Sequence, residues 1–222
     1  MTAPSPPFTP FPGARIAVVG LGRAGLPAAL RLASWGADVT AWDDKPEARA
    51  AAEAAGLTVQ DPAAGPFRAD ALLLSPGIPH ELPAPHPAAV AAKAAGVPVL
   101  CDAEFLYRAV LARHSKARFV GVTGTNGKST TTALIHHLCV TAGIPAAMGG
   151  NIGLPILSQD ALPSGGVYVL ELSSYQIDLT HSLACDAAAL INLSPDHLDR
   201  YEGYEAYMAS KARLFEMQMD KQ

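Results

Sequence analysis

Cysteine, long apolar runs and concentrated positive charge are all scarce in this sequence. Its three cysteines, Cys101, Cys139 and Cys185, have no paired spacing, which suits a reducing cytosol and offers neither a disulfide framework nor a zinc site. No apolar run approaches the roughly 18 residues of a membrane span, so no membrane partner is expected. The net charge is −4 and no basic cluster stands out, which argues against nucleic acid as a partner.

The remaining composition is that of an ordinary globular protein with a proline-rich start. Half of the 222 residues are hydrophobic and 16% are charged, which allows one large core or two modest ones. Five prolines lie between Pro4 and Pro12, and the segment lacks the basic and apolar regions of a signal peptide. We expect residues 1–13 to form a disordered tail.

Short apolar runs alternate with helical segments along the rest of the chain. In the first half, the pattern predicts strands at 16–19, 38–42, 71–74 and 97–101, and helices at 26–35, 46–55, 87–95 and 103–114. This alternation is typical of a parallel sheet covered on both faces. A polar stretch, 114–116, predicts a domain boundary, so we expect a Rossmann-like unit over 14–114 and a second α/β unit over 115–222.

A glycine-rich turn between an apolar strand and a helix opens the second unit. Residues 119–122 predict a buried strand and residues 129–140 a helix, with Gly124-Thr125-Asn126-Gly127 between them. Backbone N–H groups in such a turn form an anion nest, and the helix N-terminus adds partial positive charge. Lys128 can reach terminal phosphates, and the Ser129 hydroxyl can bind Mg²⁺. The turn has only two residues between its glycines, fewer than the usual motif, yet it predicts a triphosphate-binding loop.

A second glycine-rich turn lies in the first unit. Gly20-Leu-Gly-Arg-Ala-Gly25 follows a predicted strand and precedes a helix, and Asp43-Asp44 follows the next strand. This is the dinucleotide fingerprint in its usual context. Other nucleotide diphosphates can use the same turn, so a nucleotide ligand is expected here and its identity stays open.

Acidic side chains follow two further strands of the second unit. Glu171 ends the predicted strand 167–172, where a nucleotide enzyme needs a Mg²⁺ ligand. Asp196, His197 and Asp199 follow the predicted strand 187–192, on the side where open sheets bind ligands. Lys211 lies on the last predicted helix, 203–217, and no physical pattern distinguishes it from an exposed lysine.

Four sequence blocks together resemble one family, the Mur ligases, which are ATP-dependent amide ligases of peptidoglycan assembly. The blocks are GTNGKST (124–130), GGNIG (149–153), ELSSYQ (171–176) and NLSPDHLDRY (192–201). The resemblance runs from about residue 14 to residue 217, and the shortened phosphate loop is the family's own version.

The resemblance implies a role for individual residues. It implies that ATP binds Gly124, Thr125, Asn126, Gly127, Lys128, Ser129 and Thr130. It implies that a UDP-sugar substrate, in place of NAD, contacts Gly22, Arg23, Asp43, Asp44, Ser75, Asn151, Ser173 and His197. The implied catalytic residues are Lys128, Glu171, His197 and Lys211.

Two Mg²⁺ ions are also implied, one bound by Ser129 and Glu171 and one by His197 and Lys211. Lys211 would be N-carboxylated, because CO₂ converts this cation into an oxygen ligand that suits a hard metal. Ala24 departs from the family, which often has a hydroxyl residue in this turn.

The implied reaction is addition of D-glutamate to UDP-N-acetylmuramoyl-L-alanine through an acyl phosphate formed with ATP. The resemblance also implies a cytoplasmic, monomeric enzyme whose partners are these small molecules. Family members have a C-terminal amino-acid-binding domain, which we expect to be absent here together with part of the ATP domain, leaving this chain inactive alone. A nicotinamide oxidoreductase would leave the phosphate loop unexplained. A non-catalytic nucleotide-binding module would leave Glu171 and His197 unexplained, and ELSSYQ speaks against a folate ligase.

Overall fold

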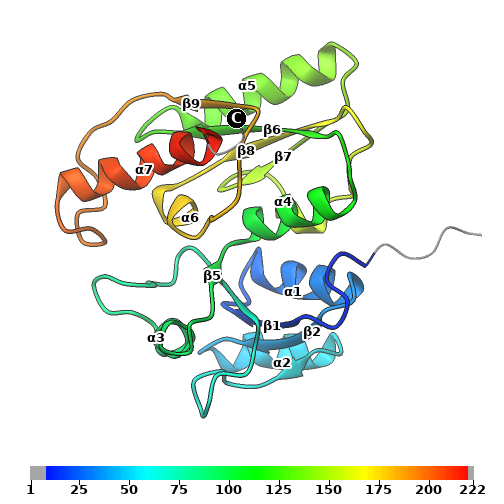
Figure 1. Cartoon of the computed structure of the whole chain (residues 1–222), viewed down its shortest axis with the longest axis vertical. Helices are drawn as coiled ribbons and strands as arrows, with labels where there is room; N and C mark the ends of the chain where they lie inside the picture. The colour runs from blue at the N-terminus through cyan, green and yellow to red at the C-terminus, as the bar shows by residue number, and fades with distance from the viewer. Residues whose placement is uncertain (1–8, 220–222) are drawn as a thin grey trace, which may run out of the picture.

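Two parallel sheets, one in each half of the chain, organise this computed structural model, which describes residues 9–219 (Figure 1). The first sheet has the order β3-β2-β1-β4-β5 and the second the order β7-β8-β6-β9. All strand pairs are parallel. The strands are β1 (Arg15–Val19), β2 (Asp38–Trp42), β3 (Thr58–Val59), β4 (Ala71–Leu74), β5 (Val99–Leu100), β6 (Arg118–Thr123), β7 (Ala146–Gly150), β8 (Val167–Glu171) and β9 (Ala187–Leu190). The predicted fold class, a Rossmann-like unit followed by a phosphate-loop α/β unit, is confirmed.

The helices connect these strands as crossover segments. They are α1 (Gly25–Ser34), α2 (Pro46–Ala54), α3 (Pro87–Ala94), α4 (Asp102–Ala112), α5 (Lys128–Thr141), η1 (Ile156–Ser158, a 3₁₀ helix), α6 (Ser174–Asp178) and α7 (Tyr204–Met219). Helices on both faces bury the strands between them, which explains why β4 and β8 are buried at every position and read as continuous apolar runs. The predicted boundary at residues 114–116 lies after α4 and before β6, between the two sheets.

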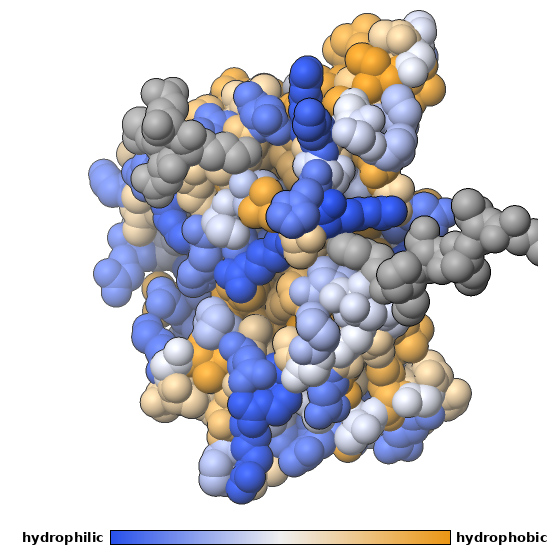
Figure 2. Space-filling model, turned by 45° about the vertical axis from the view of Figure 1, so that its right-hand side comes forward, coloured by the Kyte–Doolittle hydropathy of each residue, from blue (hydrophilic) through white to orange (hydrophobic). Residues whose placement is uncertain are grey.

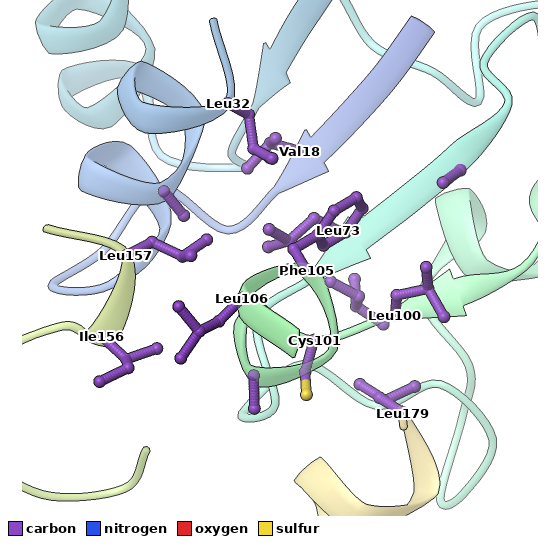
Figure 3. Close-up of a cluster of buried hydrophobic side chains, with 14 of the residues drawn as sticks. Val18, Leu32, Leu73, Leu100, Cys101, Phe105, Leu106, Ile156, Leu157 and Leu179 are labelled. Atoms are coloured by element: carbon purple, nitrogen blue, oxygen red, sulfur yellow. The ribbon is translucent and has the colours of Figure 1, made fainter. Parts of the chain in front are cut away.

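One hydrophobic core joins the two halves of the chain. Phe105 and Leu106 of α4 and Ile156 and Leu157 of η1 belong to the same buried cluster as Val18 of β1 (Figure 3). Burying a large apolar side chain stabilises a fold by about 1.5–3 kcal/mol, so this shared cluster holds the two sheets against each other.

Arg31 of α1 adds polar bonds to the same junction. Its guanidinium donates to the carbonyl oxygens of Leu157 (2.7 Å), Ser158 (3.3 Å) and Gln159 (3.2 Å). A planar fork of five donors suits this role, because it can satisfy several carbonyl groups at the end of η1 at once. The first half therefore packs against the second half through both apolar and polar contacts.

The predicted disordered tail is wrong for its last residues. Residues 1–8 lie outside the described residues, so that part of the prediction stays untested. Phe11, however, packs against Trp35 (ring centroids 6.1 Å apart) and Phe105 (5.6 Å), and its N–H donates to the Trp35 carbonyl. The prolines around Phe11 predicted an unstructured segment, but its aromatic ring packs against the hydrophobic core.

Exposed apolar side chains gather on the outer face of α5. Leu134, Leu138 and Val140 are each more than half exposed, and Figure 2 shows orange residues at the top of the molecule, where Figure 1 places α5. The opposite face of α5 packs on β6, β7 and β8. Within residues 9–219, no helix has the length and apolar character that crossing a membrane requires.

Candidate nucleotide and substrate site

The predicted site residues lie at the carboxyl ends of the strands. In the first sheet, β1 and β4 are neighbours at the point where the strand order reverses, and open parallel sheets bind ligands at such a point. The turns after these strands contain Gly20 and Ser75, and the Ser75 hydroxyl donates to the Gly20 carbonyl oxygen at 2.8 Å. In the second sheet, the ends of β6, β8 and β9 carry the phosphate loop, Glu171 and the loop around His197.

The three glycines of the first turn differ in what surrounds them. A Cβ on Gly25 would overlap the Gly20 carbonyl oxygen and lie 2.8 Å from its carbon, and a Cβ on Gly20 would lie 2.7 Å from Ser75. Gly25 is therefore required where α1 begins against the end of β1, and Gly20 is required where the glycine turn contacts the Ser75 turn after β4. A Cβ on Gly22 would meet no atom within 4 Å. Open space beside this backbone is what a ligand such as a diphosphate needs for close approach.

Asp43, at the end of β2, is already bound to the backbone. One carboxylate oxygen accepts from the Leu21 N–H (2.7 Å) and the other from the Lys45 N–H (2.9 Å). The neighbouring Asp44 lies 3.4 Å from His86, whose other ring nitrogen accepts from Ala88 N–H and caps α3. Asp43 thus holds the glycine turn and the start of the segment before α2 in place.

The phosphate loop has the geometry that its glycines predict. Gly127 has φ of 83° and precedes α5, which has no side-chain cap at its N-terminus, so the first N–H groups of the helix are available to an anion. The Asn126 N–H donates to the Asn192 side chain (2.9 Å), and Asn192 donates back to the Asn126 carbonyl (2.9 Å). The loop after β9 thereby holds the phosphate loop. Lys128 lies folded on the loop, donating to the Thr125 carbonyl at 2.8 Å.

Ser129, Glu171 and Asn151 form a connected polar group beside this loop. The Ser129 hydroxyl donates to one Glu171 oxygen at 2.8 Å, and the Asn151 amide donates to the other at 3.2 Å. Glu171 is buried, with 1% of its surface exposed. Two oxygen ligands at right angles on Mg²⁺, each about 2.1 Å from the ion, lie about 3 Å apart. The Ser129–Glu171 spacing therefore fits one Mg²⁺ site.

Lys211 is buried among groups that do not neutralise it. Its ammonium donates to the carbonyl oxygen of Gly124 (3.1 Å) and lies 4.7 Å from the centre of the Tyr207 ring. Burial, and next the charge of Lys128, lowers the pKa of Lys211 to about 8. The helical pattern alone predicted that Lys211 would lie in solvent, but the residue is only 2% exposed. That reading of Lys211 is wrong, because α7 turns this position toward the phosphate loop.

His197 lies in the same region but does not contact Lys211 directly. Its backbone is left-handed, with φ of 53°, and its ring lies 5.1 Å from Tyr175 and 6.4 Å from Tyr207. Nε2 lies 3.6 Å from Asp196. Among residues 9–219 no three His, Cys, Asp or Glu side chains gather as a metal site. As an ammonium ion, Lys211 has no lone pair for a metal, so a second Mg²⁺ site fits these residues only with a carboxylated Lys211.

A cavity of about 170 Å³ connects the glycine turn of the first half to the second half. Arg23 crosses it and donates to the Gly153 carbonyl oxygen, and Asn151 lies in its wall. Asp102, at the start of α4, also lines the cavity, and burial raises its pKa to about 6. Asp102 was not predicted, since its neighbours in the sequence give no sign of this position. Asn151 links the cavity wall to the Ser129–Glu171 pair, because its amide donates to Glu171.

Ser173 differs from the other predicted substrate residues, because its side chain caps α6. It accepts from the Gln176 N–H (3.3 Å) and donates to the Gln176 side chain (3.1 Å). Gln176 itself also lines the cavity. The structure thus gives Ser173 a local role as the first residue of a capping box, close to the cavity wall.

Fold and site together define a two-unit nucleotide-binding protein, with a Rossmann-like glycine turn facing a phosphate-loop unit across a shared cavity. Residues 122–222 match the Mur ligase middle domain. Residues 15–72 match the NAD binding domain of 6-phosphogluconate dehydrogenase.

Two relatives that match 94% of this chain have the same name. The UDP-N-acetylmuramoylalanine–D-glutamate ligase of Novosphingobium aromaticivorans is 59% identical over 94% of this chain and 46% of its own length. The ligase of the same name from Sphingopyxis alaskensis is 54% identical over 94% of this chain and 47% of its own. Nearly the whole chain is therefore similar to Mur ligases, and it spans about half the length of these relatives.

Solved structures share the fold. UDP-N-acetylmuramate–alanine ligase from Thermotoga maritima has a TM-score of 0.54 and 23% identity, over 90% of this chain and 46% of that one. UDP-N-acetylmuramate:L-alanyl-gamma-D-glutamyl-meso-diaminopimelate ligase from Neisseria meningitides has a TM-score of 0.52 and 22% identity, over 92% and 68%.

Proposed function

We propose that this chain supplies the nucleotide-substrate site and the ATP phosphate loop of a ligase that adds D-glutamate to UDP-N-acetylmuramoyl-L-alanine. The observation that carries the proposal is the cavity lined by Arg23 and Ala24 of the glycine turn on one side and by Asn151 on the other, because Asn151 also donates to Glu171, the partner of Ser129. A UDP-linked substrate with its diphosphate at Gly22 would extend through this cavity toward the γ-phosphate of ATP. The names of the relatives support the choice of substrates.

In the first chemical step, an oxygen of the substrate carboxylate attacks the γ-phosphorus, and the bond to the β-phosphate oxygen breaks. ADP leaves and an acyl phosphate forms. The Lys128 ammonium, released from the Thr125 carbonyl, would bind the β- and γ-phosphate oxygens, while the N–H groups at the start of α5 hold the same anion. Asn151 would orient the substrate's acyl end beside Glu171.

Ser129 and Glu171 would hold one Mg²⁺, and His197 and a carboxylated Lys211 a second. When bound, these ions supply charge that offsets the negative charge shared by the carboxylate and the triphosphate. The neutral amine is the form of lysine that reacts with CO₂, and the lowered pKa of Lys211 increases the fraction of that form near neutral pH. Carbon-13 nuclear magnetic resonance with ¹³C-bicarbonate tests this modification, because a carbamate carbon on Lys211 gives a signal that Lys211→Met lacks.

In the second step, the nitrogen of D-glutamate attacks the acyl carbon, phosphate leaves, and the amine loses a proton to give the amide. This step needs the amine held in line, and positioning can supply roughly 7–11 kcal/mol of a barrier. The relatives are about twice as long as this chain.

Parallel titrations of UDP-N-acetylmuramoyl-L-alanine, NADH and Mg-ATP test the proposal. We expect saturable binding of the first and third, with little affinity for NADH. The match of residues 15–72 to an NAD binding domain makes NADH the specific alternative. Micromolar NADH binding without binding of the UDP-sugar would reassign the first half to a dinucleotide. We further propose that the enzyme is cytoplasmic and monomeric. Light scattering of the purified protein measures its oligomeric state.

A further inference from the structure

Arg200 connects the two halves of the chain next to the candidate site. It lies in the loop after β9, three residues beyond His197, and its N–H donates to the His197 carbonyl oxygen at 2.9 Å. Its side chain leaves this loop and donates through Nη1 to the carbonyl oxygen of Gly77 at 3.4 Å. Gly77 belongs to the turn after β4, so this bond spans 123 positions of sequence.

The turn that Arg200 reaches is itself tied to the glycine turn. Ser75, two residues before Gly77, donates to the Gly20 carbonyl oxygen at 2.8 Å. A shift of the Ser75 turn on ligand binding at Gly20 and Gly22 would therefore move the carbonyl that Arg200 holds.

On its other side Arg200 is packed against the histidine loop through an aromatic ring. The guanidinium carbon lies 4.2 Å from the centre of the Tyr175 ring, within the range of a cation–π interaction. The same ring lies 5.1 Å from the His197 ring. Gly77, Arg200, Tyr175 and His197 thus form a continuous set of contacts from the first half to the second.

The bonding of Arg200 is incomplete in this arrangement. Nη2 is buried and has no hydrogen-bond partner within the described part of the chain. A buried donor without a partner is costly, so an arrangement that satisfies Nη2 would be favoured once the neighbouring turn moves. Arg200 also lines a groove of about 870 Å³ between residues 80–94 and α7, which leaves room for the side chain to move.

We propose that Arg200 is a positioning residue that couples the UDP-substrate turn to His197, so that the UDP-substrate and Mg-ATP strengthen each other's binding. This inference rests on the proposed function, because it assigns one ligand to each half. Coupling between two sites is reciprocal, and typical couplings change affinity about 5- to 150-fold.

The test measures the affinity of the chain for a non-hydrolysable ATP analogue with Mg²⁺, with and without saturating UDP-N-acetylmuramoyl-L-alanine, by isothermal titration calorimetry. We expect the wild-type ratio of the two dissociation constants to be about fivefold or more. Arg200→Ala should bring the ratio close to one while each ligand alone still binds. Tyr175→Leu should have the same effect, and Tyr175→Phe, which keeps the ring, should not.

Arg68→Ala is the matched control, because Arg68 is an exposed arginine outside these contacts and its loss should leave the ratio unchanged. Arg200→Lys keeps the charge but lacks the planar fork, so it should lower the ratio without unfolding the chain. An unchanged ratio in Arg200→Ala, or a wild-type ratio of one, overturns the proposal. Unfolding of Arg200→Lys, seen by circular dichroism, also overturns it, because Arg200 would then be structural. Failure of either ligand to bind the wild type counts against the proposed function instead.

Discussion

Two alanine substitutions in one turn separate the structural role of its glycines from a ligand-binding role. Gly25→Ala places a methyl group against the Gly20 carbonyl, and Gly22→Ala places one in open space. Both positions belong to the same G-x-G-x-x-G pattern and only two residues lie between them. The steric environment predicts opposite outcomes for the two variants.

Gly25→Ala should destabilise the fold. Forcing extra atoms into a packed contact costs about 1–3 kcal/mol, and the obstacle here is backbone, which cannot rotate away. For a chain of this size 1 kcal/mol lowers the melting temperature by roughly 2–4 °C, so we expect a decrease of about 2–12 °C. Gly22 does not have a positive φ, so alanine there should leave stability unchanged or raise it by about 0.4–1 kcal/mol.

UDP-substrate affinity should be reduced in Gly22→Ala, the variant whose stability is not expected to fall. If the diphosphate approaches the backbone at Gly22, the methyl group of Gly22→Ala would block that approach and remove a charge-assisted hydrogen bond. Such a bond is worth about 1.5–3 kcal/mol, so Gly22→Ala should weaken UDP-substrate affinity roughly 10- to 150-fold. Thermal unfolding and titration calorimetry on the two variants measure both effects. Wild-type affinity in Gly22→Ala would refute the ligand interpretation, and wild-type stability in Gly25→Ala would refute the steric one.

Three further predictions concern the second half. Lys128→Ala should weaken Mg-ATP binding about 10- to 150-fold in titration calorimetry, because a charge-assisted bond to phosphate is worth about 1.5–3 kcal/mol; Lys116→Ala, an exposed control, should not. The folded state lowers the pKa of Lys211 from 10.5 to about 8, so it binds fewer protons than the unfolded state between these values, and stability should rise with pH across that window. Urea unfolding should show a smaller rise for Lys211→Met, and an equal rise would exclude Lys211 as its source. Finally, residues 1–222 supplied with UDP-N-acetylmuramoyl-L-alanine, D-glutamate and Mg-ATP should give no amide by mass spectrometry; turnover of about 1 per second or faster, an ordinary enzyme rate, would contradict this.

The strands were predictable because parallel strands covered on both faces need continuous apolar sequence. The bounds of β2 and β4 agree with the prediction at both ends. The short helix α6 was missed, although Ser173 and Gln176 have the spacing of a capping box. Residues 171–176 were interpreted only as a block that resembles the Mur ligases, and the capping-box spacing was not applied to them.

Part of the candidate site follows from local sequence, and part does not. The phosphate loop was predictable because its strand, glycines, lysine and helix are consecutive. Burial of Lys211 was not, because it depends on how α7 lies across the loop 87 positions earlier in the chain. The contacts of Arg23 and Arg200 span 130 and 123 positions, so they depend on how the two sheets are packed.

The ligand of the glycine turn illustrates why local sequence leaves the choice between NAD and a UDP-sugar open. Gly25 is fixed by its contact with the Gly20 carbonyl, Gly20 by its contact with the Ser75 turn, and Asp43 is bound to the Leu21 and Lys45 N–H groups. These features serve the fold of the turn whichever nucleotide binds. On the proposed function, the features that would distinguish the ligands lie at the other wall of the cavity, at Gly153 and Asn151, because only a substrate that extends toward the second half would use them. The fingerprint predicts a nucleotide, and the proposed choice of a UDP-sugar depends on residues that the second half supplies.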